Sequence, residues 1–256
     1  MTGENTTAAC AALVERADPE RFAAAMAADP GDRATLFTLY AFNAELARAP
    51  WASKEAMIAE MRLQWWHDVI EAEASGPAAP HEVASPLGVL IRSRALPLAP
   101  FVAMVAARRW DIYRDPHADE AALWAYLEDT GGALMLLAHR ALGGNAAADG
   151  AARSLGAAAA LANYLRAVPR LEELGRIPLV DGRTEAVAAL ARAGLDRLAA
   201  ARGAGVARGA ALGAVLTRPV LDMAVAEPGR VAAGALILPE FTRRRRLLWQ
   251  SLTGRF

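Results

Sequence analysis

Residues 61–68 read Met-Arg-Leu-Gln-Trp-Trp-His-Asp and combine charged and large aromatic side chains within about two helical turns. On a helix with about 100° between residues, Arg62 and Asp68 fall within the same apolar arc as Trp65 and Trp66. An isolated charge in such an arc is strongly disfavoured, so these two must be paired or must face a cavity. Two interpretations stay open: the charges fix helix packing, or they line a central cavity of a helical bundle. The tryptophans suit the core better than ligand stacking.

Three aspartates follow a spacing that could serve a divalent cation. Asp111, Asp115 and Asp119 stand at i, i+4 and i+8, which places them on one face of an uninterrupted helix. Pro116 interrupts that helix, so we expect Asp115 at a helix end and Asp119 as the next N-cap. Capping is therefore favoured over metal binding. A single cysteine excludes an internal disulfide, and the four histidines lack zinc-site spacing.

A run of four arginines stands close to the C-terminus, just before Leu247, Leu248 and Trp249. These arginines are Arg243, Arg244, Arg245 and Arg246. Four adjacent residues point in several directions around a helix. We consider two interpretations: a solvated terminal helix, or a helix whose arginines and Trp249 contact anionic lipid or a membrane-bound partner.

The elements that must position these groups are helices throughout. Asp18-Pro19 is typical of an N-cap followed by a first-turn proline, and the pair Gly131-Gly132 predicts a bend. No alternating strand pattern and no repeat is found. The predicted helices cover residues 18–28, 32–48, 53–74, 85 onward, 96–113, 119–142 and 151–168, then two or three over 184–226, and a basic one at about 240–256. We expect an all-α fold in a single domain over residues 1–256.

Composition limits the classes of function. The chain has 256 residues, of which 55% are hydrophobic, and its 28 acidic and 28 basic residues balance to a net charge of zero. This balance argues against a nucleic-acid partner. Residues 1–9 carry no Lys or Arg, so no signal peptide is expected, and the apolar runs fall short of a membrane span. We therefore expect a cytoplasmic location.

The order of four segments resembles the squalene/phytoene synthase family. The segments are residues 39–42 (Leu-Tyr-Ala-Phe), 62–68, 163–166 (Asn-Tyr-Leu-Arg) and 175–179 (Gly-Arg-Ile-Pro-Leu), within a likeness that spans residues 8–180. The resemblance implies an isoprenoid-synthase-like helical bundle around a central cavity. Active members of the family join two prenyl diphosphates head to head. They hold Mg²⁺ on two facing aspartate-rich motifs, since divalent ions neutralise the diphosphate leaving group.

Both aspartate-rich motifs depart from the family pattern in this chain. The first should follow residues 40–42, but residues 43–50 contain Glu45 as their one carboxylate. The second should begin just after Arg166, where Ala167 and then Pro169 stand, and its second aspartate would fall near Leu171. Glu172 and Glu173 are adjacent and do not supply the i, i+4 pair. Two losses in one functional unit argue against Mg²⁺-dependent ionisation.

This combination is similar to the non-catalytic branch of the family, which includes the mitochondrial complex I assembly factor of squalene/phytoene-synthase type. The likeness rests on Arg-Leu-Gln-Trp-Trp, on the Arg166 to Pro169 segment, and on the closing residues 254–256. It implies a protein that acts by binding, with a protein partner that could be a subunit of a membrane respiratory complex. It also implies assembly of respiratory complex I, peripheral contact with the inner membrane, and no cofactor.

Two alternatives to that binding role remain open. An active prenyl transferase would need to hold Mg²⁺ on Glu45, Asp68 and Glu172 or Glu173. A carrier of an apolar lipid would hold it in the central cavity that the resemblance implies. For the binding role, the resemblance implies these remnant-cavity residues: Tyr40, Glu45, Arg62, Trp65, Trp66, Asp68, Asn163 and Arg166.

Overall fold

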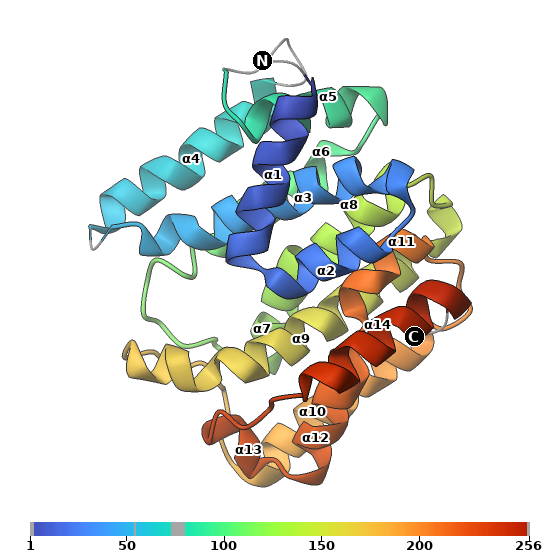
Figure 1. Cartoon of the computed structure of the whole chain (residues 1–256). Coiled ribbons are helices and arrows are strands. Elements are labelled where there is room, and N and C mark those ends of the chain that lie inside the picture. The colour runs from blue at the N-terminus through green and yellow to red at the C-terminus, as the bar shows by residue number, and fades with distance from the viewer. Residues whose placement is uncertain (1–2, 54, 73–79, 255–256) are drawn as a thin grey trace.

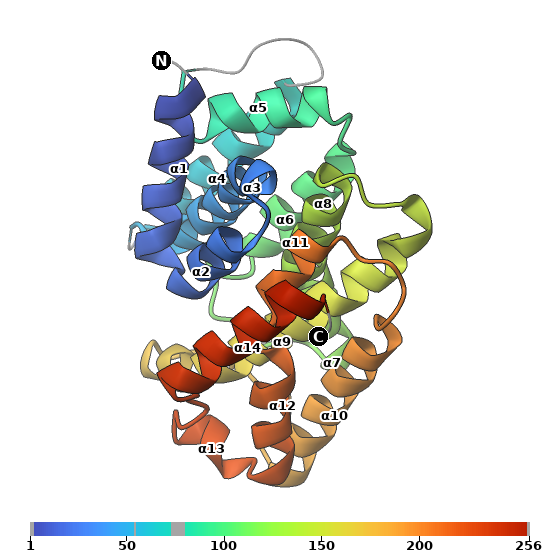
Figure 2. The ribbon, with the colours of Figure 1, turned by 45° about the vertical axis from the view of Figure 1, so that its right-hand side comes forward.

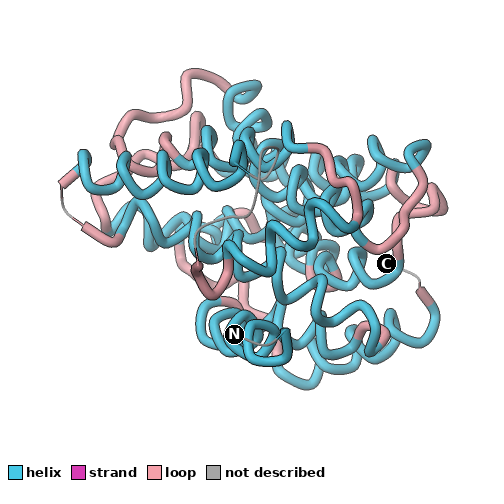
Figure 3. Tube along the Cα trace, turned by 90° about the horizontal axis from the view of Figure 1, so that it is seen from above, coloured by secondary structure: helices cyan, strands magenta, loops and turns pink. Residues whose placement is uncertain are grey.

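The computed structural model describes residues 3–53, 55–72 and 80–254, with side chains from residue 6 onward. Every regular element in those ranges is helical, and Figure 3 shows no strand among them. The all-α prediction is confirmed. Lys54, most of the predicted 76–80 loop and the last two residues of the closing Gly-Arg-Phe lie outside the described ranges.

The first half of the described chain forms a layered group of helices (Figure 1). Its elements are α1 (Gly3–Ala17), α2 (Pro19–Ala27), α3 (Pro30–Arg48), the short η1 (Ala49–Trp51), α4 (Ala56–Ala72), α5 (Ala84–Ser93) and α6 (Leu98–Arg108). Helix α3 lies at the centre of this group because residues 36–43 are buried on all sides. The residues that follow Tyr40 on α3 therefore lie near the middle of this group of helices.

The second half surrounds the longest helix, α9. Its elements are α7 (Glu120–Leu127), the π-helical η2 (Glu128–Gly132), α8 (Ala133–Ala141), η3 (Ala146–Ala148), α9 (Asp149–Glu173), α10 (Thr184–Ala200), α11 (Arg208–Ala211), η4 (Leu212–Ala214), α12 (Thr217–Ala226), α13 (Gly229–Ala232) and α14 (Glu240–Thr253). Figure 2 shows α10, α12 and α13 together at one end, with α14 crossing the outside above them. One stretch of α9 supplies buried side chains to both hydrophobic clusters.

Local signals in the sequence place several helix boundaries correctly. Asp18 accepts a 2.9 Å hydrogen bond from the Arg21 amide ahead of Pro19, so it is an N-cap. Asp119 accepts a 2.7 Å bond from the Ala122 amide at the start of α7. Such side-chain caps satisfy amides that have no partner within the helix. The capping prediction for Asp119 is therefore confirmed.

The predicted bend near Gly131-Gly132 is a π-helical turn packed against α9. A Cβ added to Gly156 on α9 would come within 2.3 Å of the Gly131 carbonyl oxygen and 2.5 Å of the Met135 Cβ. Only hydrogen on both glycines permits this approach of two helix backbones. Packing, as well as the π-turn, therefore explains why small residues stand here.

The structure differs from the prediction most clearly in one helix and two helix ends. Helix α1 was not expected, yet Cys10 and Val14 are fully buried. Helix α6 ends at Arg108 rather than near residue 113, and turns follow it. Helix α9 continues through Pro169 to Glu173. Proline removes one amide donor, but Pro169 stands in the last turns of a helix whose Leu165 and Val168 are buried in the second cluster. Packing outweighs that loss.

One stretch, Arg208–Ala226, is long and apolar enough to cross a membrane by length and composition alone. It comprises α11, η4 and α12, and 56% of it is buried inside the structure. Core helices pass the same test, so burial against neighbouring helices accounts for the apolar residues here.

Candidate functional site

A cavity of about 240 Å³ lies between α3, α6, α7 and α9. We call it the central cavity. From the α3 side, Asn43, Ala47 and Trp51 line it, and from α9 Ala167 and Leu171 do so. These residues stand at four-residue spacings, which keep them on one face of their segments. The cavity therefore lies between the two segments in which the sequence resemblance places the aspartate-rich motifs.

A larger cleft of about 550 Å³ adjoins the central cavity and shares Asn43, Ala47, Arg21 and Arg108 with it. Residues of α1, α2 and α3 form most of its wall. The charged residues of the cleft are Arg16, Asp18, Arg21, Glu45, Arg48, Glu82 and Arg108. Four of these residues are basic and three are acidic, so the cleft carries no strong excess of either sign.

Arg21 and Arg48, two of the arginines that line the cleft, are held by carboxylates of the same chain. Arg21 Nη1 lies 2.7 Å from Asp18 Oδ2, and Arg48 Nη2 lies 2.9 Å from Glu45 Oε1. These are close, charge-assisted contacts. A guanidinium held in this way is less available to an incoming anion.

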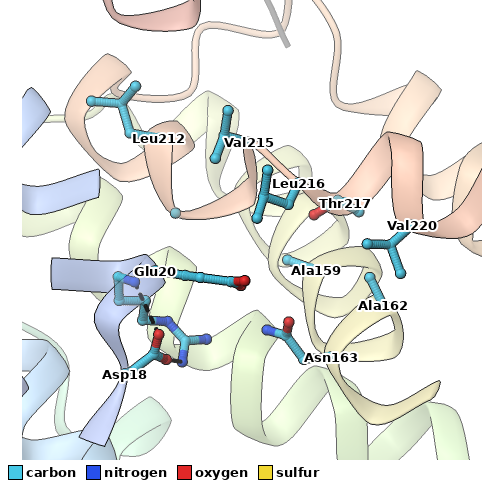
Figure 4. A pocket seen from close by; sticks show the side chains of 12 residues that line it. Asp18, Glu20, Ala159, Ala162, Asn163, Leu212, Val215, Leu216, Thr217 and Val220 are labelled. Atoms are coloured by element: carbon cyan, nitrogen blue, oxygen red, sulfur yellow. Dashed lines mark hydrogen bonds and ion pairs between the residues drawn. The ribbon is translucent and has the colours of Figure 1, made fainter. Parts of the chain in front are cut away.

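A third, small pocket lies between α2, α9 and the η4–α12 segment. In Figure 4, Glu20 and Asn163 reach into this space from α2 and α9. The carboxylate of Glu20 accepts two hydrogen bonds, at 2.7 and 2.9 Å, from the guanidinium of Arg166. That two-point contact fixes α2 against α9 at the edge of the pocket.

A buried network of Arg108, Asp111 and Tyr126 closes the inner wall of the central cavity. Arg108 Nη1 donates to the Tyr126 hydroxyl at 2.8 Å and to Asp111 Oδ2 at 3.0 Å. The Tyr126 hydroxyl lies 3.1 Å from both Asp111 oxygens. Burial raises the pKa of Tyr126, while the Arg108 charge opposes that rise. The phenol therefore stays protonated and donates to the carboxylate.

Arg176, in the loop after α9, contacts the turn that carries Asp111. Its guanidinium donates to the Trp110 carbonyl at 3.4 Å and to the Asp111 carbonyl. It also lies 4.8 Å from the Trp51 ring centroid and 5.2 Å from that of Trp110. Gly175 precedes it with φ of 75°, which favours glycine. The 175–179 motif thus joins the end of α9 to the turn after α6.

His117 stacks on Trp110 with ring centroids 4.0 Å apart and planes 9° from parallel. Burial lowers the pKa of His117 to about 4, and the nearby Asp111 charge works against that shift. Its Nε2 and the indole nitrogen of Trp110 are buried without hydrogen-bond partners in the described part of the chain. This imidazole is neutral at physiological pH.

The positions that face one another across the central cavity carry no carboxylate. They are Asn43, Ala47 and Trp51 on one side and Ala167 and Leu171 on the other. Over the described residues, no group of three or more His, Cys, Asp or Glu side chains could hold a metal ion. Mg²⁺ prefers hard oxygen ligands, which these side chains do not supply as a set.

Several of the predicted remnant-cavity residues do lie at this site. Asn163 lines the central cavity and the small pocket, and Glu45 lines the cleft. Tyr40 is buried, and the centroid of its ring lies 5.8 Å from the guanidinium carbon of Arg21. Burial raises the pKa of Tyr40 to about 12. Arg166 stands at the edge, bound to Glu20. These four come from α3 and α9, whose facing sides form the site.

The structure corrects the prediction for α4. Arg62, Trp65 and Asp68 are exposed on its outer face, and the buried face includes Leu63 and Trp66 instead. Trp66 packs edge-on against Phe42, with centroids 5.2 Å apart, so it belongs to the core. Because apolar residues stand on both faces of α4, the helical wheel alone could not show which face is buried.

The alternative set of metal ligands is also corrected. Asp68 accepts a 2.8 Å hydrogen bond from Gln64 on the exposed side of α4. Glu45 is paired with Arg48, while Glu172 and Glu173 are exposed near the end of α9. These carboxylates do not meet around one point, so they cannot act together as ligands of one ion.

Sequence reasoning missed Arg21, Arg108, Tyr126 and Arg176 as parts of the site. The signal available was the segment Arg-Arg-Trp-Asp at residues 108–111, which places two guanidinium groups, an indole and a carboxylate together. Only the fold brings Tyr126 and Arg176 to that segment, since they follow Asp111 by 15 and 65 residues.

The predicted basic helix is α14. Arg243 and Arg244 pair with Glu240, and Arg243 Nη1 also lies 3.5 Å from Glu20 Oε1. Arg245 lies over the Phe241 ring at 5.9 Å, and Arg246 lines a separate pocket with Trp249. The four arginines therefore point in different directions, as the sequence predicts.

The squalene/phytoene synthase family model matches residues 14–249. Among curated proteins, a Drosophila melanogaster homolog of NADH dehydrogenase (ubiquinone) complex I, assembly factor 6, is 34% identical over 172 residues, covering 62% of this chain and 50% of that protein. The Homo sapiens assembly factor 6 is 28% identical over 162 residues, covering 62% and 48%. The match thus spans about half the length of these relatives.

Solved structures of the same architecture include a dehydrosqualene synthase with ligand. It superposes with a TM-score of 0.80 at 17% identity, over 98% of this chain and 97% of the other. Squalene synthase HpnC from Alicyclobacillus acidocaldarius gives 0.72 at 17% identity, over 90% and 95%. At these identities the likeness concerns the fold, and it agrees with the bundle described above.

Proposed function

The chain belongs to the squalene/phytoene synthase family, and we propose that it is a member that acts by binding rather than by catalysis. One observation carries the proposal. The two helical faces that meet across the central cavity present Asn43, Ala47, Ala167 and Leu171, none of which is a carboxylate. Prenyl diphosphate ionisation requires divalent ions against the leaving group, and those ions require oxygen ligands here.

The charges that remain at the site support the same proposal. Four arginines at the cleft, the cavity and their edge are satisfied by carboxylates of the chain itself: Arg21 with Asp18, Arg48 with Glu45, Arg108 with Asp111, and Arg166 with Glu20. A diphosphate would have to break such pairs before it could be bound by guanidinium groups. The pairs serve to hold the helices together.

The relatives suggest the process in which the protein takes part. Both curated relatives cited above carry the name of a complex I assembly factor. We propose that this chain assists assembly of the NADH dehydrogenase of the respiratory chain through a protein partner. We further propose that it works in the cytoplasm at the periphery of the inner membrane, where that enzyme is assembled.

The outer face of α4 is the surface we propose for the protein partner. Met57 and Met61 are 70% and 66% exposed, and Ile58 and Trp65 extend the same exposed apolar ridge. Single exposed apolar residues are common, but a contiguous ridge marks an interaction site. Methionine suits such a surface because its flexible side chain adapts to a partner.

The first test is a Mg²⁺-dependent assay of diphosphate release from farnesyl and geranylgeranyl diphosphates. We expect no turnover from folded protein beside an active family member as the positive control. Turnover above that of a control reaction without protein would overturn the non-catalytic proposal, whether or not the protein assists assembly.

The second test is deletion of the gene in the organism that encodes it, followed by a native-gel measurement of assembled NADH dehydrogenase. We expect a loss of the assembled enzyme, restored by the wild-type gene but not by Met61→Glu. Val89→Glu is the matched control, because Val89 is an exposed apolar residue on α5 outside the ridge. Normal assembly in the deletion strain would refute the assembly role, and full rescue by Met61→Glu would refute the α4 surface.

A further inference from the structure

Helix α14 lies across the outside of the bundle (Figures 1 and 2), and four of its large apolar side chains are exposed to solvent. Phe241, Leu248, Trp249 and Leu252 are between 60% and 74% exposed. The opposite side is seated on the protein, where Gln250 is buried and donates a 2.8 Å hydrogen bond to the Ala211 carbonyl. The exposed side chains therefore belong to a fixed helix, whose length is about 20 Å.

A basic pocket of about 250 Å³ opens beside this apolar surface. Arg202 after α10, Arg218 on α12 and Arg246 on α14 line it together with Trp249, and no carboxylate is among the lining residues. Three arginines from three separate elements thus converge on one hollow.

Arg246 has unused hydrogen-bonding capacity at this pocket. Its Nε is buried and has no hydrogen-bond partner among the described residues. Arg218, by contrast, pairs with Asp222 of its own helix, whose Oδ2 lies 3.7 Å from Nε. Burying a donor without an acceptor is unfavourable, and a guanidinium fits the oxygens of a phosphate group especially well. An oxyanion in the pocket would satisfy the Arg246 donor.

We propose that the pocket and the exposed face of α14 together bind an anionic phospholipid at a membrane surface, with the phosphate between the arginines. Trp249 connects the two parts: it lines the pocket and is itself exposed. Tryptophan favours the boundary between headgroups and acyl chains, while Leu248 and Leu252 would enter the apolar layer. The apolar face is what favours a lipid over free phosphate. This inference concerns a second surface and does not depend on the assembly role.

The test is flotation of the full chain with vesicles of phosphatidylcholine alone or mixed with phosphatidylglycerol. We expect binding to the anionic vesicles and little to the neutral ones. Arg218→Gln and Arg246→Gln should each lower the affinity about fivefold, as expected for one basic contact at a charged surface. Arg170→Gln removes the same charge from an exposed position on α9 and should leave affinity unchanged.

Further arms separate the lipid from other anions and from non-specific attraction. Brominated lipid should quench tryptophan fluorescence in the wild type and quench it less in Trp249→Phe. Absence of vesicle binding by folded protein would overturn the proposal, even if inorganic phosphate stabilised the pocket. Equal losses for Arg170→Gln and Arg246→Gln would overturn it as well, since they would show dependence on net charge alone. None of these results depends on whether complex I assembly fails in the deletion strain.

Discussion

Replacing Arg108 by methionine, in the wall of the central cavity, should lower the free energy of unfolding by more than the loss of packing contacts alone would. The variant keeps a long side chain but removes the donors to Tyr126 at 2.8 Å and to Asp111 at 3.0 Å. Asp111 is only 5% exposed, so its charge stays behind in a poorly solvated place. The perturbation therefore isolates the cost of an unpaired buried carboxylate.

The size of the effect follows from the geometry of what remains. Breaking a buried ion pair by removing one partner costs about 3–5 kcal/mol. The Tyr126 hydroxyl still lies 3.1 Å from both carboxylate oxygens, so we expect the lower end, about 3 kcal/mol. For a chain of this size that corresponds to a fall in Tm of roughly 6–12 °C. Thermal and urea unfolding, each followed by circular dichroism, measure both quantities.

A double-mutant cycle distinguishes the charge effect from a simple loss of contacts. Arg108→Met with Asp111→Leu removes both charges, so its stability should return to within about 1 kcal/mol of the wild type. The pair Arg170 and Glu173 on α9 is the control, since these side chains are 69% and 64% exposed at 2.8 Å. Its cycle should give a coupling of at most about 0.5 kcal/mol. A double variant as unstable as the sum of its single variants would refute the reasoning.

Three further predictions rest on packing, titration and metal binding. Gly156→Ala should destabilise by about 3 kcal/mol because its Cβ meets the neighbouring backbone, whereas Gly150→Ala, which meets nothing within 4 Å, should not; chemical unfolding of both variants checks this. The pKa of His117 is lowered to about 4, so the neutral ring stabilises the fold above its unfolded pKa near 6.5, and up to about 3 kcal/mol is lost as pH falls from 6.5 towards 4. In His117→Phe that part of the pH dependence should disappear from the unfolding free energy, and an unchanged profile would contradict the assignment. Neither millimolar Mg²⁺ nor EDTA should shift the Tm by more than about 1 °C, because the site supplies no set of metal ligands. An ion that bound the native state alone would raise the Tm.

Local chemistry made much of the fold and part of the site predictable. The Asp18 and Asp119 caps and the bend at Gly131-Gly132 each depend on residues close in sequence, and each is found where the pattern predicts it. The missing carboxylates were found through the family resemblance, which implied the two motif positions on what are α3 and α9. The predictions that were wrong concern features that depend on neighbouring helices. The orientation of α4 is set by its neighbours rather than by its own apolar residues, which stand on both faces.

Long-range contacts account for the remaining errors. Pro169 sits inside α9 because the buried residues around it hold the helix together, and no local signal reports that packing. The network of Arg108, Asp111 and Tyr126 joins residues from two helices and the turn between them, and Arg176 reaches it from beyond α9. A single sequence shows the residue types but not which of them meet. The residues expected on α3 and α9 therefore lie at the site, whereas those expected on α4 do not, and the inner wall was missed.

The carboxylate of Glu20 is shared by two guanidinium groups, Arg166 on α9 and Arg243 on α14. It also lines the small pocket between α2, α9 and the η4–α12 segment (Figure 4). One negative charge thus takes part both in seating the outermost helix and in lining an internal space. A cation entering that space would compete with Arg243 for Glu20 and loosen α14. Because thermodynamic coupling is reciprocal, a surface that lifts α14 would strengthen cation binding inside by the same factor. Through Glu20, occupation of this pocket by a cation and the attachment of α14 would therefore be coupled.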